Sequence, residues 1–272
     1  MSTAALAARI ARRIAAEGPI SVAAFMAMAL HDPKDGYYSR THPIGAAGDF
    51  VTAPEISQIF GELIGLWCAR MWDVIGRPDP VILAELGPGR GVLAQDLLRA
   101  AGTVPAFRRA LRLYLVEASP GLRGEQGRRL ATAAPVWLDE IGDLPAGPLL
   151  LVANEFLDAL PIRQLVRGPA GWSERMVALD AAGALVFADL PAGPAAALLA
   201  AQRGRGGEQP GDVVEICPAA LALAAALGNR LAHQPGAALF IDYGHTDYRR
   251  AGDRRGGSLR AVRRHRPAAV LS

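Results

Sequence analysis

The stretch VILAELGPGRG, residues 81–91, joins a short apolar run to a turn that contains Gly87, Gly89 and Gly91. An apolar run of this length that ends in glycines predicts a buried strand, a tight turn and then a helix. Glycines let a ligand approach the main chain closely, and the N–H groups of the following helix favour polar or negative groups there. The stretch therefore predicts the cofactor-binding turn of an α/β fold.

Two residues of this stretch indicate which cofactor the turn holds. Dinucleotide folds use G-x-G-x-x-G, but here Val92 stands where the last glycine is needed. Glu85, just before the turn, would repel a pyrophosphate, whereas it suits the ammonium and sulfonium of S-adenosylmethionine. An NAD(P)-dependent oxidoreductase remains a weaker alternative, because the chain also lacks a Tyr-x-x-x-Lys pair and Lys34 is its sole lysine.

Polar residues also follow the next predicted strands. Glu117 can accept both hydroxyls of a ribose, although NAD enzymes use an acid in the same way. Trp137 fits an adenine flank and plain core packing equally well, and Asp139 can accept from the exocyclic amine of adenine. Asn154 and Glu155 directly follow an apolar run, which places them at the carboxyl edge of the sheet, where open α/β folds bind ligands.

The rest of the pattern predicts the fold class. Strands are expected at 81–86, 112–117, 135–138, 148–153 and 237–242, with helices at about 91–101, 119–131 and 218–233. Strands that alternate with helices predict a parallel, Rossmann-like α/β sheet covered on both faces. Short antiparallel strands and a small helix at 194–202 are expected within an insertion at about 161–217.

The N-terminal part, residues 1–76, is predicted to be mainly helical. Helices are expected at 3–17, at 21–31 with Ser21 as N-cap, and at 54–76. The irregular segment between the last two is rich in turn residues and aromatics, which is typical of a functional loop. The expected division is an N-terminal helical extension with an active-site loop at 1–76, followed by the α/β domain at 77–272. The apolar face of helix 54–76 fits either a core or a homo-oligomer interface.

Composition limits the classes of protein to which the chain can belong. Of 272 residues 51% are apolar and the net charge is +3, and no uncharged apolar run is long enough for a membrane span. Cys68 and Cys217 sit in apolar contexts, which favours a reduced, cytoplasmic protein, and no Cys/His spacing indicates a metal site. The Ala/Arg-rich start reads as a surface helix rather than a transit peptide. The Arg-rich stretch 249–266 reads as a solvated tail rather than a nucleic-acid patch, so no DNA partner is expected.

Five motifs carry a resemblance to a known family: GPISVAAFMAMALHDPKDGYYS, GDFVTAPEISQIFGELIG, ELGPGRG, NEFLDALPIRQ and FIDYGH. They resemble the MidA-type proteins of bacteria and mitochondria, which are class I S-adenosylmethionine-dependent methyltransferases. Mitochondrial members act in respiratory complex I assembly and methylate an arginine of one of its subunits. The resemblance, from about residue 18 to about residue 266, implies S-adenosyl-L-methionine as cofactor and a protein substrate such as a respiratory complex subunit.

The resemblance also implies roles for individual residues. The glycine turn with Pro88 would hold the methionine moiety beside Glu85, and Glu117 would take the ribose. The loop residues expected to cover the cofactor and shape the acceptor pocket are Asp49, Phe50, Thr52, Glu55 and Gln58. Asp242 and Tyr243 would lie at the same sheet edge. Glu155 and Glu55, with Asn154 facing the methyl donor, are the expected catalytic groups, since carboxylates can hold a guanidinium and aim its nitrogen.

The chain departs from the family at its end. Family members continue well beyond the FIDYGH region, whereas this sequence keeps SLRAVRRHR and stops at PAAVLS. A truncated product is therefore expected, which lacks the last strands of the sheet and leaves strand 237–242 with an open edge. This expectation supports an alternative function: a non-catalytic assembly or chaperone-like protein that retains the cofactor-binding fold.

Overall fold

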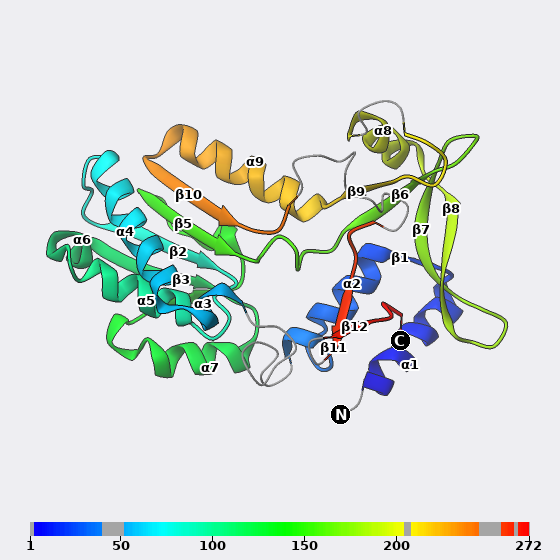
Figure 1. Ribbon diagram of the computed structural model, residues 1–272, viewed down its shortest axis with the longest axis horizontal. Coiled ribbons are helices and arrows are strands. Elements are labelled where there is room, and N and C mark those ends of the chain that lie inside the picture. The colour runs from blue at the N-terminus through cyan, green and yellow to red at the C-terminus, as the bar shows by residue number, and fades with distance from the viewer. Residues whose placement is uncertain (1–2, 40–51, 204–207, 245–256, 264–265, 272) are drawn as a thin grey trace. The chain divides into compact units, whose positions relative to one another are not determined.

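The computed structural model describes residues 3–39, 52–203, 208–244, 257–263 and 266–271 (Figure 1). The chain forms two compact units. The first contains Met1–Ser39, Ala159–Leu221 and Gly244–Ser272, and the second contains Arg40–Asp158 and Ala222–Tyr243. These units do not follow the expected division at residue 76, because the helices before it are shared between the two.

The second unit is built on a five-stranded parallel sheet with the order β10-β5-β2-β3-β4. Its strands are β2 (Val81–Leu86), β3 (Leu111–Val116), β4 (Val136–Leu138), β5 (Leu149–Asn154) and β10 (Gly236–Ile241). The predicted parallel α/β sheet is confirmed, since each strand lies within one residue of its predicted start. Among the described residues β10 pairs only with β5.

Helices cover both faces of this sheet, which explains why its strands are apolar throughout (Figure 1). Val81 and Leu83 of β2 belong to one core with α4 and α5, whereas Ile82, Ala84 and Leu86 belong to another with α9. The helices concerned are α3 (Ala53–Ile56), α4 (Gln58–Val74), α5 (Val92–Ala101), α6 (Pro105–Ala110), α7 (Pro120–Arg129) and α9 (Pro218–His233), with the short turns η2 (Ala131–Ala133) and η3 (Ile141–Asp143).

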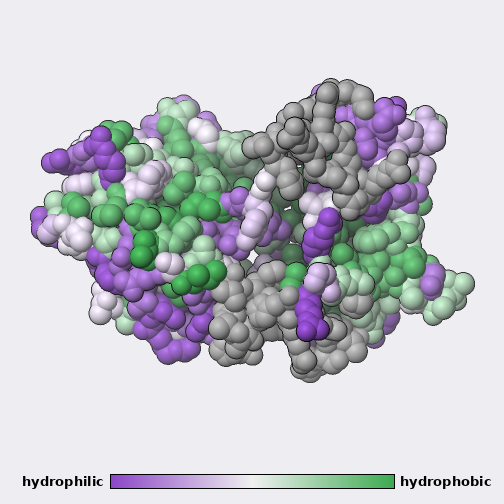
Figure 2. Space-filling view, viewed as in Figure 1, coloured by the Kyte–Doolittle hydropathy of each residue, from purple (hydrophilic) through white to green (hydrophobic). Residues whose placement is uncertain are grey.

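The prediction of a single helix at 54–76 is wrong, because the structure has two helices there, α3 and α4. Ser57 between them is extended, with φ −144° and ψ 119°, so the helical path is interrupted there. At Gly65 a Cβ would lie 2.6 Å from the Leu97 carbonyl oxygen, so this glycine lets α4 approach α5 closely. Only one face of α4 enters the core. Ile59, Leu63 and Leu66 of α4 are exposed, as is Ile56 of α3. This apolar surface is visible in green over α3 and α4 in Figure 2.

The first unit contains the antiparallel strands expected in the insertion. The sheet order is β1-β7-β6-β9, with β8 paired to β7. Its elements are α1 (Thr3–Glu17), β1 (Ile20–Ser21), α2 (Val22–His31), η1 (Tyr37–Ser39), β6 (Arg163–Arg167), β7 (Trp172–Leu179), β8 (Leu185–Pro191), α8 (Pro194–Arg203) and β9 (Val213–Ile216), together with the hairpin β11 (Ala261–Arg263) and β12 (Arg266–Ala268). The N-terminal segment joins this sheet because Ile20 of β1 pairs with Val177 of β7.

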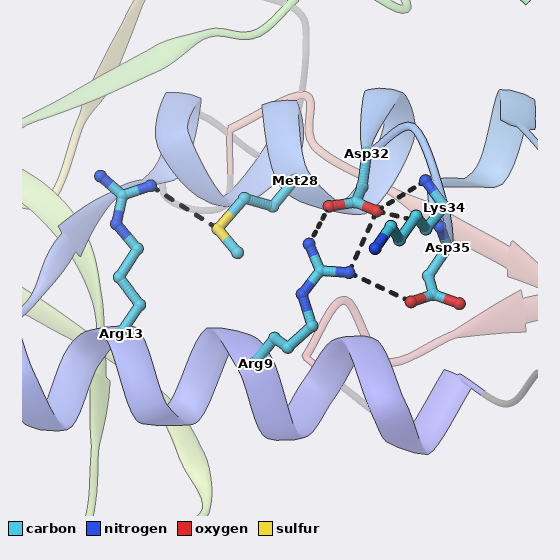
Figure 3. A network of polar contacts seen from close by, with 6 residues as sticks. All are labelled: Arg9, Arg13, Met28, Asp32, Lys34 and Asp35. Atoms are coloured by element: carbon cyan, nitrogen blue, oxygen red, sulfur yellow. Dashed lines mark hydrogen bonds and ion pairs between the residues drawn. The ribbon is translucent and has the colours of Figure 1, made fainter.

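A polar cluster fixes α1 against the end of α2 (Figure 3). Arg9 donates to the Asp32 carboxylate, and its Nη1 lies 3.1 Å from Asp35 Oδ2. The backbone N–H groups of Lys34 and Asp35 also donate to Asp32, at 3.0 and 2.9 Å. These hydrogen bonds, with that from Arg9 first, lower the pKa of Asp32 to about 2. Ser21 caps α2 as predicted, since its hydroxyl accepts from the Ala24 N–H.

Two general findings bear on function. In the described part of the chain, no helix combines the length and apolar character that a membrane span requires. The same residues contain no group of three or more His, Cys, Asp or Glu side chains arranged to hold a metal ion.

Candidate functional site

The glycine turn connects β2 to α5 at the carboxyl edge of the parallel sheet. Gly87, Gly89 and Gly91 have φ values of +60°, +52° and +78°, which residues with a side chain rarely adopt. A Cβ on Gly87 would also lie 3.0 Å from the Phe156 ring. Gly91 donates its N–H to the Pro88 carbonyl at 2.8 Å and is the N-cap of α5. The turn thus leaves open main chain where a ligand can approach closely.

Glu85, at the end of β2, is a buried acid with a free oxygen. Only 5% of the residue is exposed, and the Ala94 backbone N–H of α5 donates to its carboxylate. Oε2 has no hydrogen-bond partner among the described residues. Burial, with a smaller contribution from the charge of Glu117, raises the pKa of Glu85 to about 8. A buried acceptor without a donor is costly, so this position favours a ligand that brings a donor or a positive charge.

Glu117 follows β3, the neighbouring strand. Its Oε1 accepts from the Ser119 backbone N–H at 2.8 Å, and its Oε2 lies 3.3 Å from Gln126 Nε2. Burial is the main reason that the pKa of this carboxyl is raised. Arg123 donates through Nε to the Glu117 carbonyl oxygen at 2.6 Å, which fixes the backbone at the strand end. Glu117 is therefore held at the sheet edge, as a ribose acceptor requires.

Gln126 is a residue of this site that the sequence reasoning missed. It lies on α7 with none of its surface exposed. Its Nε2 donates to the Gly89 carbonyl at 2.7 Å as well as toward Glu117. Its Oε1 accepts from Trp137 Nε1 at 2.8 Å. One amide thereby joins the glycine turn, Glu117 and β4. The sequence feature that could have indicated its burial is its spacing: Gln126 lies four residues from both Leu122 and Leu130, on the same face of the helix.

Trp137 and Asp139, the two predicted adenine contacts, interact with other protein groups in the structure. The Trp137 indole N–H is used by Gln126, and its ring packs against the core on the α4–α5 face of the sheet. The Asp139 side chain is 80% exposed and forms an ion pair with Arg123, with Asp139 Oδ1 2.6 Å from Nη2. A role for Asp139 toward adenine stays a prediction.

Asn154 and Glu155 lie at the carboxyl end of β5, next to β2. Glu155 has φ +48°, an uncommon value for a residue with a side chain, and its N–H donates to the Ile241 carbonyl at 2.8 Å. Burial, then the nearby charge of Asp158, raises the pKa of Glu155, although the Ala53 N–H and the Asn154 amide donate to its carboxylate. Asn154 Oδ1 is buried and has no partner among the described residues.

Asp242, after β10, holds the turn that follows Glu155. Its Oδ2 accepts from the backbone N–H groups of Leu157 and Asp158, at 2.7 and 3.3 Å. Its Oδ1 accepts from the Tyr243 N–H at 2.8 Å. Tyr243 itself is 78% exposed, and the charge of Glu155 is the main cause of its raised pKa. Asp242 and Tyr243 thus lie at the sheet edge as expected, with Asp242 engaged by the backbone.

The predicted covering loop lies only partly in the described residues. Asp49 and Phe50 fall outside them, whereas Thr52 is the N-cap position of α3. Glu55 faces the glycine turn through an ion pair, since its Oε2 is 3.5 Å from Arg90 Nη1. Gln58 does not join the site: it is exposed and bonds to Glu62 on the same helix at 2.7 Å.

These groups fit S-adenosylmethionine better than a dinucleotide. Glu85 Oε2 and Asn154 Oδ1 are unpaired acceptors at the ends of two adjacent strands, at the edge of the sheet where the glycine turn follows β2. An ammonium supplies donors to such oxygens, whereas a pyrophosphate supplies only further acceptors and negative charge. Glu117 adds an acceptor for ribose hydroxyls. Glu85, Glu117, Asn154 and the glycine turn are therefore the residues that would hold this cofactor.

Comparison with known proteins agrees with this geometry. A family described as "Putative S-adenosyl-L-methionine-dependent methyltransferase" matches residues 63–272. The chain belongs to this family. A crystal structure of a Burkholderia thailandensis protein, bound to S-adenosyl-homocysteine and described as a "likely methyl transferase", superposes with a TM-score of 0.82 at 33% identity, over 97% of this chain and 69% of that one. The predicted methyltransferase fold and family resemblance are confirmed.

Curated relatives of this family member include proteins named "Protein arginine methyltransferase NDUFAF7, mitochondrial". The one from Xenopus tropicalis is 37% identical over 284 residues, which cover 96% of this chain and 64% of the relative. The human one is 36% identical over 260 residues, covering 86% and 58%. The chain thus spans less than two thirds of the length of either. The prediction of a cytoplasmic protein is wrong by this comparison, because these relatives are mitochondrial proteins.

Proposed function

We propose that this family member transfers a methyl group from S-adenosylmethionine to an arginine side chain of a protein. The observation that carries the proposal is the pair of buried, unpaired acceptors, Glu85 Oε2 and Asn154 Oδ1, beside the open glycine turn. The arginine acceptor follows from the names of the relatives. The family resemblance adds a subunit of respiratory complex I as the proposed partner.

The protein's contribution is mainly binding and positioning. When bound, S-adenosylmethionine supplies an electrophilic methyl group on a sulfonium, so the chain needs no nucleophile of its own. Glu85 and Asn154 would accept from the ammonium, and Glu117 would accept from the ribose hydroxyls. Holding the donor and the acceptor nitrogen in line provides most of the rate enhancement in such a displacement.

Glu155 is the proposed contact for the acceptor. Its carboxylate can pair with a guanidinium in the fork geometry that carboxylates and arginines share. As the nitrogen–carbon bond forms and the sulfur–carbon bond breaks, the nitrogen must release a proton. A carboxylate whose pKa is raised by burial is a better proton acceptor than an ordinary one, which suits Glu155 for this step. Glu55 is held by Arg90, so its proposed role is secondary.

Replacement of Glu155 by Gln tests the proposal. We expect turnover to fall by about a hundredfold or more, because general-base and charge contacts contribute on this scale, while the affinity for S-adenosylmethionine stays within a few-fold. Affinity would be measured by calorimetry and turnover by transfer of a labelled methyl group to an arginine-containing protein. Glu62→Gln serves as the control for removing an acidic charge, because Glu62 pairs with Arg99 and lies outside the proposed site. Unchanged turnover in Glu155→Gln would remove this residue from the reaction.

The binding measurement separates this proposal from the alternatives. Absence of S-adenosylmethionine binding to the unmodified chain would contradict the proposed site itself. Binding without transfer to any arginine-containing protein would instead support the non-catalytic assembly protein. Tighter binding of NAD than of S-adenosylmethionine would favour the oxidoreductase.

A further inference from the structure

The second unit carries two adjoining hollows on the surface formed by α5, α6 and α7. The larger, about 520 Å³, is lined by Arg90, Gln95, Glu125, Arg128 and Arg129. The smaller, about 260 Å³, is lined by Gln95, Leu98, Arg99, Arg108, Arg129, Leu130, Thr132 and Ala133. Gln95 and Arg129 line both, so the hollows adjoin, and the residues over α7 are coloured hydrophilic in Figure 2. The proposed methyl-transfer site uses none of the groups in the smaller hollow.

Three guanidinium groups on this surface lack a carboxylate. Arg108 and Arg128 form no ion pair with any residue in the described part of the chain. Arg129 is fixed in place by neutral acceptors, since its Nε donates to the Arg90 carbonyl at 3.0 Å and its Nη1 to Gln95 Oε1 at 2.9 Å. Its positive charge is therefore oriented without being neutralised. Such a group strongly favours a carboxylate or another anion.

The smaller hollow also has an apolar part. Leu98, Leu130 and Ala133 line it together with the guanidinium groups of Arg99, Arg108 and Arg129. Leu98 and Leu130 belong to the core and are only 9% and 2% exposed, so the apolar part is small and half-buried Ala133 contributes most of it. An ion with no apolar portion, such as phosphate, would make no use of these three side chains. A ligand with both an apolar side chain and carboxylates would satisfy the whole lining.

We propose that these hollows bind an acidic segment of a polypeptide, with an apolar side chain in the smaller hollow and flanking Asp or Glu side chains on Arg108, Arg128 and Arg129. Two adjoining hollows fit an extended segment rather than a single small anion. Glu125 lies in the larger hollow and opposes a uniform polyanion such as nucleic acid, whereas a segment of mixed composition can place its acids to avoid it. The smaller hollow shares no residue with the proposed methyl-transfer site, whereas Arg90 of the larger hollow lies in the glycine turn and pairs with Glu55.

Fluorescence anisotropy with a labelled peptide tests the proposal on the full chain. The probe is a ten-residue peptide with four glutamates around two central leucines, and its control has glutamine in place of every glutamate. We expect the acidic peptide to bind at least about tenfold more tightly than the neutral one, with an affinity that falls as salt screens the charges. Arg108→Gln and Arg128→Gln are each expected to weaken binding about three- to tenfold, as the loss of one charged contact does.

Arg109→Gln is the matched control, because Arg109 is exposed on the same helix as Arg108 and lines neither hollow. It should leave peptide binding within about twofold, since a distant exposed charge contributes little. Arg128 is also exposed, so its replacement should not disturb the fold, and thermal unfolding would verify each variant. The proposal is overturned if Arg109→Gln weakens binding as much as Arg108→Gln, if the neutral peptide binds equally well, or if inorganic phosphate or a single-stranded RNA displaces the acidic peptide at a lower concentration than unlabelled peptide does.

Discussion

At the scale of single residues, one buried amide organises much of the candidate cofactor site. Gln126 contacts the glycine turn through Gly89, the neighbouring strand end through Glu117, and β4 through Trp137. A glutamine can do this because its amide carries both donors and an acceptor. Gln126 touches no proposed ligand atom, so its role is to position the residues that do.

Replacement of Gln126 by Leu tests this role. The change leaves the Trp137 N–H and the Gly89 carbonyl without partners in a buried place, which should lower the free energy of unfolding by about 1–3 kcal/mol. The affinity for S-adenosylmethionine should fall as well, because Glu117 and the glycine turn lose their common support. Denaturant unfolding and calorimetry measure the two effects. Gln58→Leu, on an exposed glutamine, is the control; equal cofactor affinity in the two variants would refute the positioning role.

At the scale of elements, α4 shows how one apolar pattern serves two surroundings. Ile64 is 6% exposed and belongs to the core that α4 and α5 form with the sheet, whereas Leu63 beside it is 61% exposed. The spacing of apolar residues predicts a helix that contains both Leu63 and Ile64. It does not show which face of that helix packs against the sheet. That choice follows from the close approach of α4 to α5 at Gly65.

The two neighbouring positions should therefore respond very differently to truncation. Ile64→Ala removes buried methyl groups and leaves a cavity, so we expect a loss of about 2–5 kcal/mol in the free energy of unfolding. Leu63→Ala should change it by no more than about 0.5 kcal/mol. Urea or guanidinium unfolding compares the pair. A comparable loss at Leu63 would show that this side chain is buried in solution, for example in a homo-oligomer.

At the scale of the whole molecule, each compact unit contains a carboxyl group that couples stability to pH. In the first unit the pKa of Asp32 is lowered from 3.8 to about 2, so the stability that it contributes is present above the unfolded value and is lost as pH falls toward 2. In the second unit the pKa of Glu85 is raised from 4.5 to about 8. Its contribution is present below 4.5 and is lost as pH rises toward 8.

Stability of the unliganded protein should consequently decline on both sides of mildly acidic pH. Replacement of Glu85 by Gln is expected to flatten the decline between about pH 4.5 and 8, because the amide has no proton to release. Denaturant unfolding across this range measures the slope. Glu62→Gln, at a more exposed acid, should keep the original slope. An identical slope in Glu85→Gln and the unmodified chain would show that Glu85 titrates normally.

Sequence patterns were enough to predict the α/β sheet, the glycine turn and the strand-end acids Glu85, Glu117 and Glu155. These features are local: a strand period, glycines at positions that favour positive φ, and a polar residue at the end of an apolar run. The five strands of the parallel sheet were predicted to within one residue at their starts for the same reason.

The partners of these residues depend on the fold. The pairing of Asp139 with Arg123 and the link from Gln126 to Gly89 join residues that are distant along the chain. The grouping of α1 and α2 with the antiparallel strands is of the same kind. Packing decides which groups meet, and so which hydrogen bonds form and which side chains are buried. The sequence pattern shows the hydrophobic period of each helix or strand, but it does not show which elements pack beside it.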